Sequence, residues 1–203
     1  ATSARLNWPH DVAWNAAGEM FIADRSNNRV RKVATSGVIT TVAGTGSAGY
    51  NGDEIAAQSA QLAAPYGVAV QADGTVLIAD FDNNRIRAID VAGMIHTVAG
   101  TGVATAAGDG GPAIQADVHK PICVVNAHGS GFFVCDYNNN RVRLVDGDGV
   151  ISTIIGVGTS GFSGDGDLAV YSRGNRFGDI TITPSGDLLV VDRLNRRIRL
   201  VKQ

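Results

Sequence analysis

The sequence has few of the residues that cross-link or stiffen a small protein, and no long apolar run. Its 203 residues include only two cysteines, five prolines and two methionines, and 6% are aromatic. Two cysteines cannot form a disulfide framework, so stability must come from a hydrophobic core, for which this length is ample. No apolar run approaches the roughly 18 residues of a membrane-spanning helix. The net charge of −2 argues against a basic nucleic-acid-binding surface.

Catalytic signatures are equally scarce. The four histidines are His10, His96, His119 and His128, and none stands at metal-ligand spacing from another. The sequence contains neither a Gly-x-Ser-x-Gly nucleophile elbow nor a phosphate-binding loop. An enzymatic function would have to use His10, His119 and an acid from a loop.

Repetition is what the sequence has in abundance. Aspartates recur at a constant step of 56 residues (80 − 24), followed each time by an arginine five residues later: Asp24, Asp80, Asp136 and Asp192, with Arg29, Arg85, Arg141 and Arg197. A fixed period of this size indicates one supersecondary unit copied in tandem. A residue present in every copy therefore belongs to the scaffold, and a residue that breaks the pattern is the better functional candidate.

Each copy has the pattern of four short strands. In the second copy these are residues 67–70, 75–80, 85–89 and 94–98, rich in β-branched residues and separated by turn residues. Four antiparallel strands per repeat predict an all-β fold, a β-propeller of four blades. The long connections, such as residues 113–118 after Pro112, should form short helical turns. We expect a single domain over residues 1–203, with copies at 9–64, 65–120, 121–176 and 177–203.

The fourth copy ends after its third strand. Two arrangements fit this count: four blades around one axis with a three-stranded last blade, or a part of a larger propeller, for example a six-bladed one. The first is slightly favoured.

The repeats resemble a known family. The segment from Pro65 to Val70, and Ile78 to Arg87 with its Asp-Phe-Asp-Asn-Asn-Arg run, is similar to the NHL repeat. The tail from Thr97 to Gly102 resembles the long variant of about 56 residues found in multi-repeat bacterial and surface proteins. The resemblance implies a binding or scaffold propeller in an extracellular or cell-surface setting. Some NHL domains bind RNA, which the charge balance disfavours here.

The repeated Asp and Arg are interpreted as scaffold. Each Asp is expected to hold the following turn and to pair with the Arg five residues later, while Arg31, Arg87, Arg143 and Arg199 should lie on the blade surface. A metal-binding ring of aspartates is the disfavoured alternative. The Gly-Asp pairs at Asp53, Asp109 and Asp165 suggest calcium only weakly, because the spacing and terminal Glu of an EF-hand are missing. Turn formation explains them better.

The two cysteines fall on neighbouring strands of one hairpin. Cys123 and Cys135 could form a cross-strand bridge. Two reduced, buried thiols are favoured instead, because the positions equivalent to Cys135 in the other copies are all apolar (Ala23, Ala79 and Val191).

Non-repeating residues mark the predicted binding face. The loop after the second strand and the long connection between copies open on the same side of a propeller, and there the copies differ most. The candidate contacts are Arg25, Phe81, Tyr137 and Arg193, each directly after a repeated Asp, and Tyr50 and Phe162 in the long loops. Aromatic residues and arginine are enriched at binding hot spots. Trp8 and Trp14 are expected to pack inside.

These observations favour a non-enzymatic binding or scaffold module for a protein or glycan partner, with no cofactor. A propeller-type lyase or hydrolase is one alternative. A structural array segment that associates with its own copies through the unfinished edge of the fourth blade is another.

Overall fold

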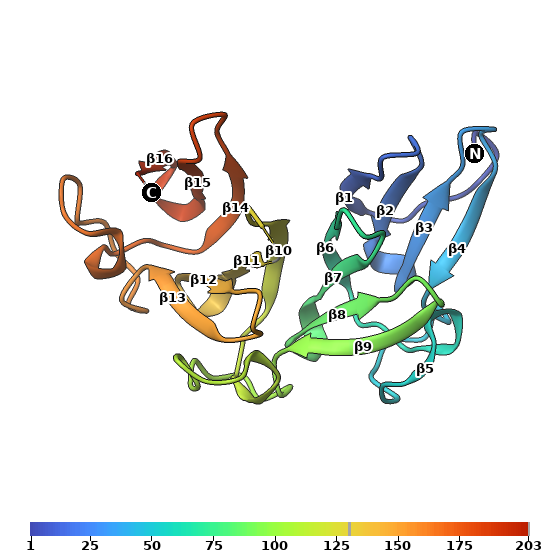
Figure 1. Ribbon diagram of the computed structural model, residues 1–203, viewed down its shortest axis with the longest axis horizontal. Helices are drawn as coiled ribbons and strands as arrows, with labels where there is room; N and C mark the ends of the chain where they lie inside the picture. The colour runs from blue at the N-terminus through green and yellow to red at the C-terminus, as the bar shows by residue number, and fades with distance from the viewer. Residues whose placement is uncertain (130, 203) are drawn as a thin grey trace.

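The computed structural model describes residues 1–129 and 131–202 and is an all-β propeller of four blades (Figure 1). In each blade the strands run antiparallel in sequence order from the axis outward. The strands of the first two blades are β1 (Pro9–Trp14), β2 (Met20–Asp24), β3 (Arg29–Val33) and β4 (Ile39–Ala43), then β6 (Pro65–Val70), β7 (Val76–Asp80), β8 (Arg85–Ile89) and β9 (Met94–Ala99). Those of the last two are β10 (Pro121–Asn126), β11 (Phe132–Asp136), β12 (Arg141–Val145) and β13 (Ile151–Ile155), then β14 (Phe177–Ile182), β15 (Leu188–Asp192) and β16 (Arg197–Val201).

The expected helical turns are present in the long connections. Single 3₁₀ turns occur there at η2 (Ala57–Ser59), η4 (Ala113–Gln115) and η6 (Ala169–Tyr171). The short strand β5 (Ile55–Ala56) in the first connection pairs with β9, so this connection also braces the outside of the next blade. Within the described residues no helix is both long and apolar enough to cross a membrane.

The hydrophobic core lies between neighbouring blades. Three clusters fill the interfaces, centred on Ile78 between blades one and two, Leu77 between two and three, and Phe177 between three and four. Successive inner strands β1, β6, β10 and β14 pack against each other in that order. The blades form an arc that is open between blades four and one (Figure 1).

The open side leaves the inner strand of blade one uncovered. Val12 is 43% exposed, whereas its counterpart Val68 is 3% exposed. Trp8 and Trp14, expected in the core, are also exposed. The prediction for both tryptophans is wrong, since Trp8 is 75% and Trp14 59% exposed.

A buried carboxylate organises each blade. Asp80 accepts hydrogen bonds from the backbone N–H of Ala63 (2.8 Å) and from the side-chain amide of Asn83 (2.8 Å). Its other neighbour is the Arg87 guanidinium at 3.6 Å. The first contact fixes the connection entering the blade, the second fixes the turn after β7, and the third fixes β8. Asp24, Asp136 and Asp192 make the same three kinds of contact.

The structure corrects the predicted arginine partner. The repeated Asp pairs with the arginine two residues beyond the expected one, so Arg87, rather than Arg85, faces Asp80. Arg85 instead donates to the carbonyl oxygen of Thr101 in the following connection. Arg87 and Arg143 are completely buried, so their expected place on the blade surface is also wrong.

A second repeated contact joins successive blades. Asn84 has the left-handed conformation (φ 53°) at the end of the turn. Its side-chain oxygen accepts the backbone N–H of Lys120 at the entry to the next blade (2.9 Å), and its amide donates to the carbonyl of Gly102 (3.2 Å). Asn28 and Asn140 repeat both bonds. Arg196 takes this position in the fourth blade.

The cysteines form a disulfide. Cys123 in β10 lies directly opposite Cys135 in β11, and their sulfur atoms are bonded. The favoured interpretation of two reduced thiols is therefore wrong. The apolar residues at positions equivalent to Cys135 indicated only that this position is buried, and a disulfide can be buried as well as a thiol can.

Replacing Asp80 with Ala should lower the free energy of unfolding by about 2–4 kcal/mol, because it removes one of the two carboxylates beside the buried Arg87 guanidinium and leaves the Ala63 N–H and the Asn83 amide without their acceptor. Asp192→Ala is the matched control: Arg199 is 11% exposed and can be hydrated, so the loss should be smaller. Urea denaturation of both variants measures this. Equal losses would contradict the assigned role of burial.

Stability should depend on the ionisation of two of these aspartates. Burial raises the pKa of Asp80 and of Asp136 to about 6, because their hydrogen bonds and arginines offset only part of the desolvation cost. The native state therefore holds more protons than the unfolded state between about pH 4 and 6, and the contribution of these groups to stability falls as pH rises through that window. Comparing the wild type with an Asp80→Asn/Asp136→Asn variant across pH 4–7 isolates this term. A wild-type curve parallel to that of the variant would contradict it.

Replacing both cysteines with Ala should cost about 3 kcal/mol of unfolding free energy, as expected for a bridge whose cysteines are 12 residues apart. Reductant should lower the stability of the wild type by a similar amount and leave the variant unchanged. A wild type that unfolds identically with and without reductant would show that the bridge does not stabilise the protein.

Candidate binding face

The repeating scaffold places non-repeating side chains around the axis. Arg25, Phe81, Tyr137 and Arg193 each begin the 3₁₀ turn that follows the second strand of their blade: η1 (Arg25–Asn27), η3 (Phe81–Asn83), η5 (Tyr137–Asn139) and η7 (Arg193–Asn195). The buried Asp before each turn and the left-handed residue after it hold the four turns alike. The four positions are therefore equivalent in geometry but different in chemistry.

Three rings form a continuous cluster in blades one and two. The ring of Tyr66 in β6 lies 4.1 Å from His10 in an edge-on arrangement and 4.5 Å from Phe81, centroid to centroid. The Arg25 guanidinium lies 4.4 Å above Tyr66. Its Nε is buried without a hydrogen-bond partner. Arg25 is thus held by the aromatic ring rather than by a counter-charge.

Blades three and four provide a second cluster. Tyr137 is only 7% exposed and packs in the core, but its hydroxyl accepts a hydrogen bond from Arg193 (3.0 Å). The guanidinium of Arg176 lies 5.2 Å from the same ring. Tyr137 is therefore a support that orients Arg193 more than a contact surface of its own.

The two clusters face each other across the open side of the arc. Burial, and then the positive charges of Arg25 and Arg193, lower the pKa of His10, while Asp179 opposes them. An arginine of blade four thus acts on a histidine of blade one. In the described part of the chain, neither Arg25, Arg176 nor Arg193 has a carboxylate within salt-bridge distance. We call this surface the axial face: His10, Arg25, Tyr66, Phe81, Tyr137, Arg176 and Arg193.

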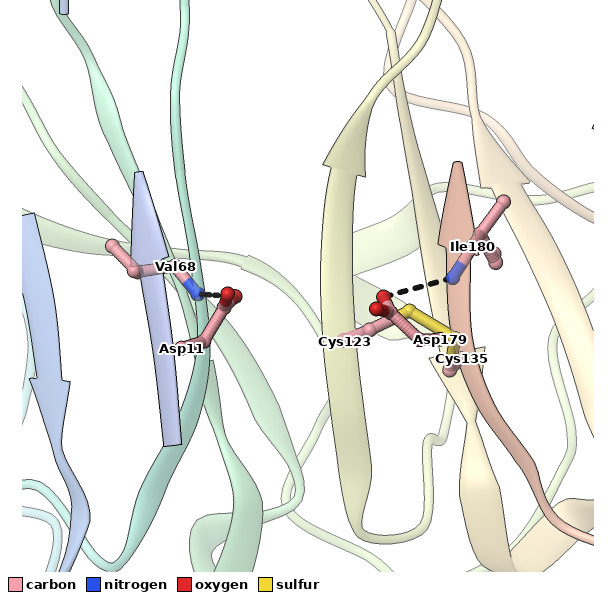
Figure 2. The surroundings of a disulfide bond; sticks show 6 residues. All are labelled: Asp11, Val68, Cys123, Cys135, Asp179 and Ile180. Atoms are coloured by element: carbon pink, nitrogen blue, oxygen red, sulfur yellow. Dashed lines mark hydrogen bonds between the residues drawn. A yellow bond between two sulfur atoms is a disulfide. The ribbon is translucent and has the colours of Figure 1, made fainter. Parts of the chain in front are cut away.

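One position of the inner strands is an aspartate in blades one and four and a different residue in blades two and three. Asp11, Gly67, Cys123 and Asp179 are equivalent in the repeat. Asp11 accepts the backbone N–H of Val68 in the next blade (2.9 Å), and Asp179 accepts that of Ile180 (2.8 Å) (Figure 2). Burial raises the pKa of Asp11, and the charge of Asp179 adds to it, so the two carboxylates sense each other across the axis.

Gly67 permits a close approach of two blades at this level. A Cβ at this position would lie 2.9 Å from the Cα of Cys123. The backbone of β6 therefore packs directly on β10, and only glycine fits there.

The long-loop aromatic residues lie elsewhere. Tyr50 packs against Arg85, whose guanidinium is 4.0 Å from the ring, and its hydroxyl donates to Asp53. Phe162 packs against Arg197 in the same way at 3.7 Å. Both hold a connection against the scaffold arginines of the following blade, and neither contacts the axial cluster.

The Gly-Asp loops also contact the scaffold. Asp53 accepts a hydrogen bond from Arg87 (2.8 Å), and Asp109 accepts one from Arg143 (2.7 Å). In the described residues no group of three or more His, Cys, Asp or Glu side chains is arranged to hold a metal ion. His10 and His119 belong to different contacts, since His119 meets Asn138 at 3.2 Å rather than the His10–Tyr66 cluster.

Sequence reasoning missed the inner-strand residues of the site. Tyr66, Asp11 and Asp179 were not among its candidates, although they break the repeat as clearly as Arg25 does. A search for residues that differ between copies would have found them if it had covered the first strand of each copy as well as the loops.

Part of the chain is similar to known NHL-repeat proteins. A profile of the teneurin NHL domain matches residues 46–107. Human teneurin-4 is 39% identical over 102 residues, which covers 44% of this chain and 4% of teneurin-4. The chloroplastic protein SUPPRESSOR OF QUENCHING 1 of Arabidopsis thaliana is 33% identical over 87 residues, covering 42% of this chain and 8% of that protein. The chain thus spans a small fraction of the curated relatives it matches.

Solved structures share the fold at low identity. A protein of unknown function from Bacteroides thetaiotaomicron aligns with a TM-score of 0.74 at 17% identity, covering 95% of this chain and 46% of that one. An auxiliary nutrient binding protein from Bacteroides ovatus gives 0.69 at 15% identity, covering 98% and 49%. Virginiamycin B lyase from Staphylococcus aureus gives 0.60 at 11% identity, covering 99% and 54%.

The constant repeat, the NHL-domain match over residues 46–107 and the four blades of the structure together confirm the resemblance of the chain to NHL-repeat β-propellers.

Proposed function

We propose that the chain is a non-enzymatic binding module that recognises a protein or glycan through its axial face. This proposal rests on one observation: Arg25 and Arg193 lie beside aromatic rings, have no carboxylate partner, and occupy a position at which the residue differs between the copies. Elsewhere in the blades the scaffold arginines Arg87 and Arg143 are paired with aspartates.

The chemistry of the face indicates the kind of group it would bind. Arg25 and Arg193 can each donate two parallel hydrogen bonds to a carboxylate or sulfate. Phe81 and Tyr66 provide a flat apolar surface suited to a sugar ring or an apolar side chain. The partner that fits is one that displays a negative group next to such a surface, as an acidic glycan or an acidic protein loop does.

The fold and the disulfide support this proposal in general terms. A solved propeller of the same fold is named as an auxiliary nutrient binding protein, although its identity of 15% relates the fold alone. The Cys123–Cys135 bridge favours an oxidising compartment, consistent with the extracellular or surface location that NHL resemblance implies. His10 and His119 do not form a catalytic pair, so we give the binding function precedence over a lyase or hydrolase.

Binding should depend on the charge of the axial face. We expect an array of acidic oligosaccharides and a glutamate-rich peptide to bind the protein more strongly than neutral oligosaccharides of the same length. Arg25→Gln or Arg193→Gln should weaken the best acidic probe about 10-fold or more, the loss of one charge-assisted contact. Titration calorimetry measures the affinities.

Two control variants sharpen the experiment. Arg5→Gln removes an equal charge from an exposed arginine outside the face and should leave the affinity unchanged. Tyr137→Phe removes only the hydroxyl that orients Arg193 and should give an intermediate loss. Preference for neutral probes, failure of all probes to bind, or equal losses in Arg5→Gln and Arg25→Gln would each refute the proposal.

A further inference from the structure

The first connection is held to the outside of blade two by side chains as well as by backbone. It covers residues 44–64, between β4 and β6. His96 in β9 has a carboxylate on each side: its Nδ1 lies 2.7 Å from Oε1 of Glu54, and its Nε2 lies 3.0 Å from Oδ2 of Asp90. Glu54 directly precedes β5, and Asp90 belongs to the turn between β8 and β9. One imidazole ring therefore joins the connection to the blade, and we call these three residues the His96 cluster.

A neutral imidazole ring cannot satisfy both contacts. It carries a single N–H, so one ring nitrogen donates while the other presents a lone pair. Whichever tautomer forms, a lone pair then faces a carboxylate oxygen at 2.7 or 3.0 Å. The protonated ring donates from both nitrogens. The geometry of the His96 cluster thus fits the imidazolium form, and loss of the proton makes one of its two contacts repulsive.

The backbone contacts of the connection lie directly beside the His96 cluster. The N–H of Glu54 donates to the carbonyl oxygen of Ile95 (2.9 Å), and the N–H of Ala57 donates to that of Gly93 (2.9 Å). Strand β5 pairs with β9 between these two bonds. The paired segment is only two residues long, so a change in the neighbouring side-chain contacts acts on a short and weak piece of sheet.

Blade three has the same backbone contacts. In the second connection, residues 100–120, the N–H of Gly110 donates to the carbonyl oxygen of Ile151 (2.8 Å), and the N–H of Ala113 donates to that of Gly149 (2.8 Å). The residue equivalent to His96 in this blade is Ser152. The backbone bonds therefore form without a histidine, and blade three is an internal comparison for blade two.

Glu54 occupies a position that favours glycine. Its φ is 57°, in the left-handed region, and the equivalent residues of the other two connections are Gly110 (φ 82°) and Gly166 (φ 90°). A side chain is disfavoured in this conformation, so the backbone alone would be better served by glycine here too. What the glutamate adds is a carboxylate within hydrogen-bond distance of His96.

Asp90 uses its two oxygen atoms differently. Oδ1 accepts the backbone N–H groups of Ala92 and Met94 (2.9 Å each) and so holds the turn, which leaves Oδ2 for His96. Asp146 holds the corresponding turn of blade three in the same way, through Oδ1 and two backbone N–H groups. The turn contacts are therefore common to both blades, whereas the contact with a histidine is specific to blade two.

We propose that the His96 cluster is a pH-sensitive latch that holds the first connection on β9 while His96 is protonated and loosens it when the ring loses its proton. The charged groups that act on the ring are Glu54, from the connection, and Asp90, from the turn, while β8 places Ala88 opposite it. The His96 side chain is 29% exposed, so water can take up the proton without unfolding of the blade. The latch lies outside the axial face and does not depend on the proposed function.

The pKa shifts give the direction of the switch. The hydrogen bonds to Asp90 and then to Glu54 raise the pKa of His96, and partial burial opposes them. The contribution of His96 is therefore complete below its ordinary pKa of about 6.5 and is lost as pH rises through the raised value. The hydrogen bond to His96 lowers the pKa of Asp90, so the contribution of Asp90 is lost only as pH falls through that lowered value. The latch is closed in mildly acidic solution and opens toward alkaline pH.

Titration of the histidine rings by NMR on the intact chain tests the charge state of the latch. We expect His96 to titrate above the ordinary histidine pKa and His119, whose pKa is lowered by burial, to titrate below it. Glu54→Gln and Asp90→Asn should each lower the pKa of His96, because each removes a negative partner but keeps an oxygen acceptor. Asp146→Asn is the matched control in blade three and should leave the pKa of His96 unchanged.

Hydrogen exchange measures the opening itself. Protection of the Glu54 and Ala57 amides, relative to an unstructured peptide at the same pH, should fall about 2- to 5-fold as pH rises through the titration of His96, the range of an exposed ion pair. Protection of the Gly110 and Ala113 amides should not follow that titration. His96→Gln removes the titrating ring and should abolish this difference between the two connections.

Four outcomes would each overturn the proposal. The first two are a His96 that titrates at or below the ordinary histidine value, and a pKa of His96 that does not respond to Glu54→Gln. The third is protection that changes with pH in parallel in both connections, or in neither, since the ion pairs would then hold nothing in place. The fourth is a pH-dependent difference that persists in His96→Gln, because another group would then cause it.

Discussion

Four buried carboxylates determine how this chain is built. Each repeated Asp binds three segments at once: the connection entering its blade, the turn after its strand, and the arginine of the next strand. A buried charge is tolerated only where hydrogen bonds and an opposite charge replace water. These contacts therefore fix the end of the second strand to one geometry, and with it the turn on which Arg25, Phe81, Tyr137 and Arg193 stand.

The same rigid turns allow the residues that hold the fold to be distinct from the residues that are proposed to bind a partner. Because the turns are held by residues that every copy contains, the side chain at the start of each turn can vary from blade to blade without changing the turn. Variation at these positions, together with Tyr66 and His10 in the inner strands, produces a mixed aromatic and basic surface on a chain of nearly balanced charge. In the proposed binding function, specificity would come from the differences between copies, since a residue shared by all blades contributes the same chemistry everywhere.

Repetition explains both what could be predicted from the sequence and what could not. Four-stranded blades, the turns in the connections and the structural use of Asp80 follow from period, strand pattern and turn chemistry. The arginine partner did not follow, because Arg85 and Arg87 lie on the same face of one strand and only the path of the next connection sends Arg85 away. The disulfide was missed because the apolar residues at the equivalent positions in the other copies were taken as the guide to Cys135. Asp11 and Asp179 were missed because differences between copies were sought in the loops and not in the first strands.

The left-handed asparagines have a consequence for how the molecule unfolds. Asn28, Asn84 and Asn140 each bond to the connection of their own blade and to the entry of the next, so a blade cannot open without breaking a bond that its neighbour needs. Stability in such an array is a sum of units and nearest-neighbour couplings. In blade four, Arg196 replaces the coupling amide at this position. Blades two and three are each coupled to a neighbour on both sides and should therefore be the last of the four to lose their amide protection.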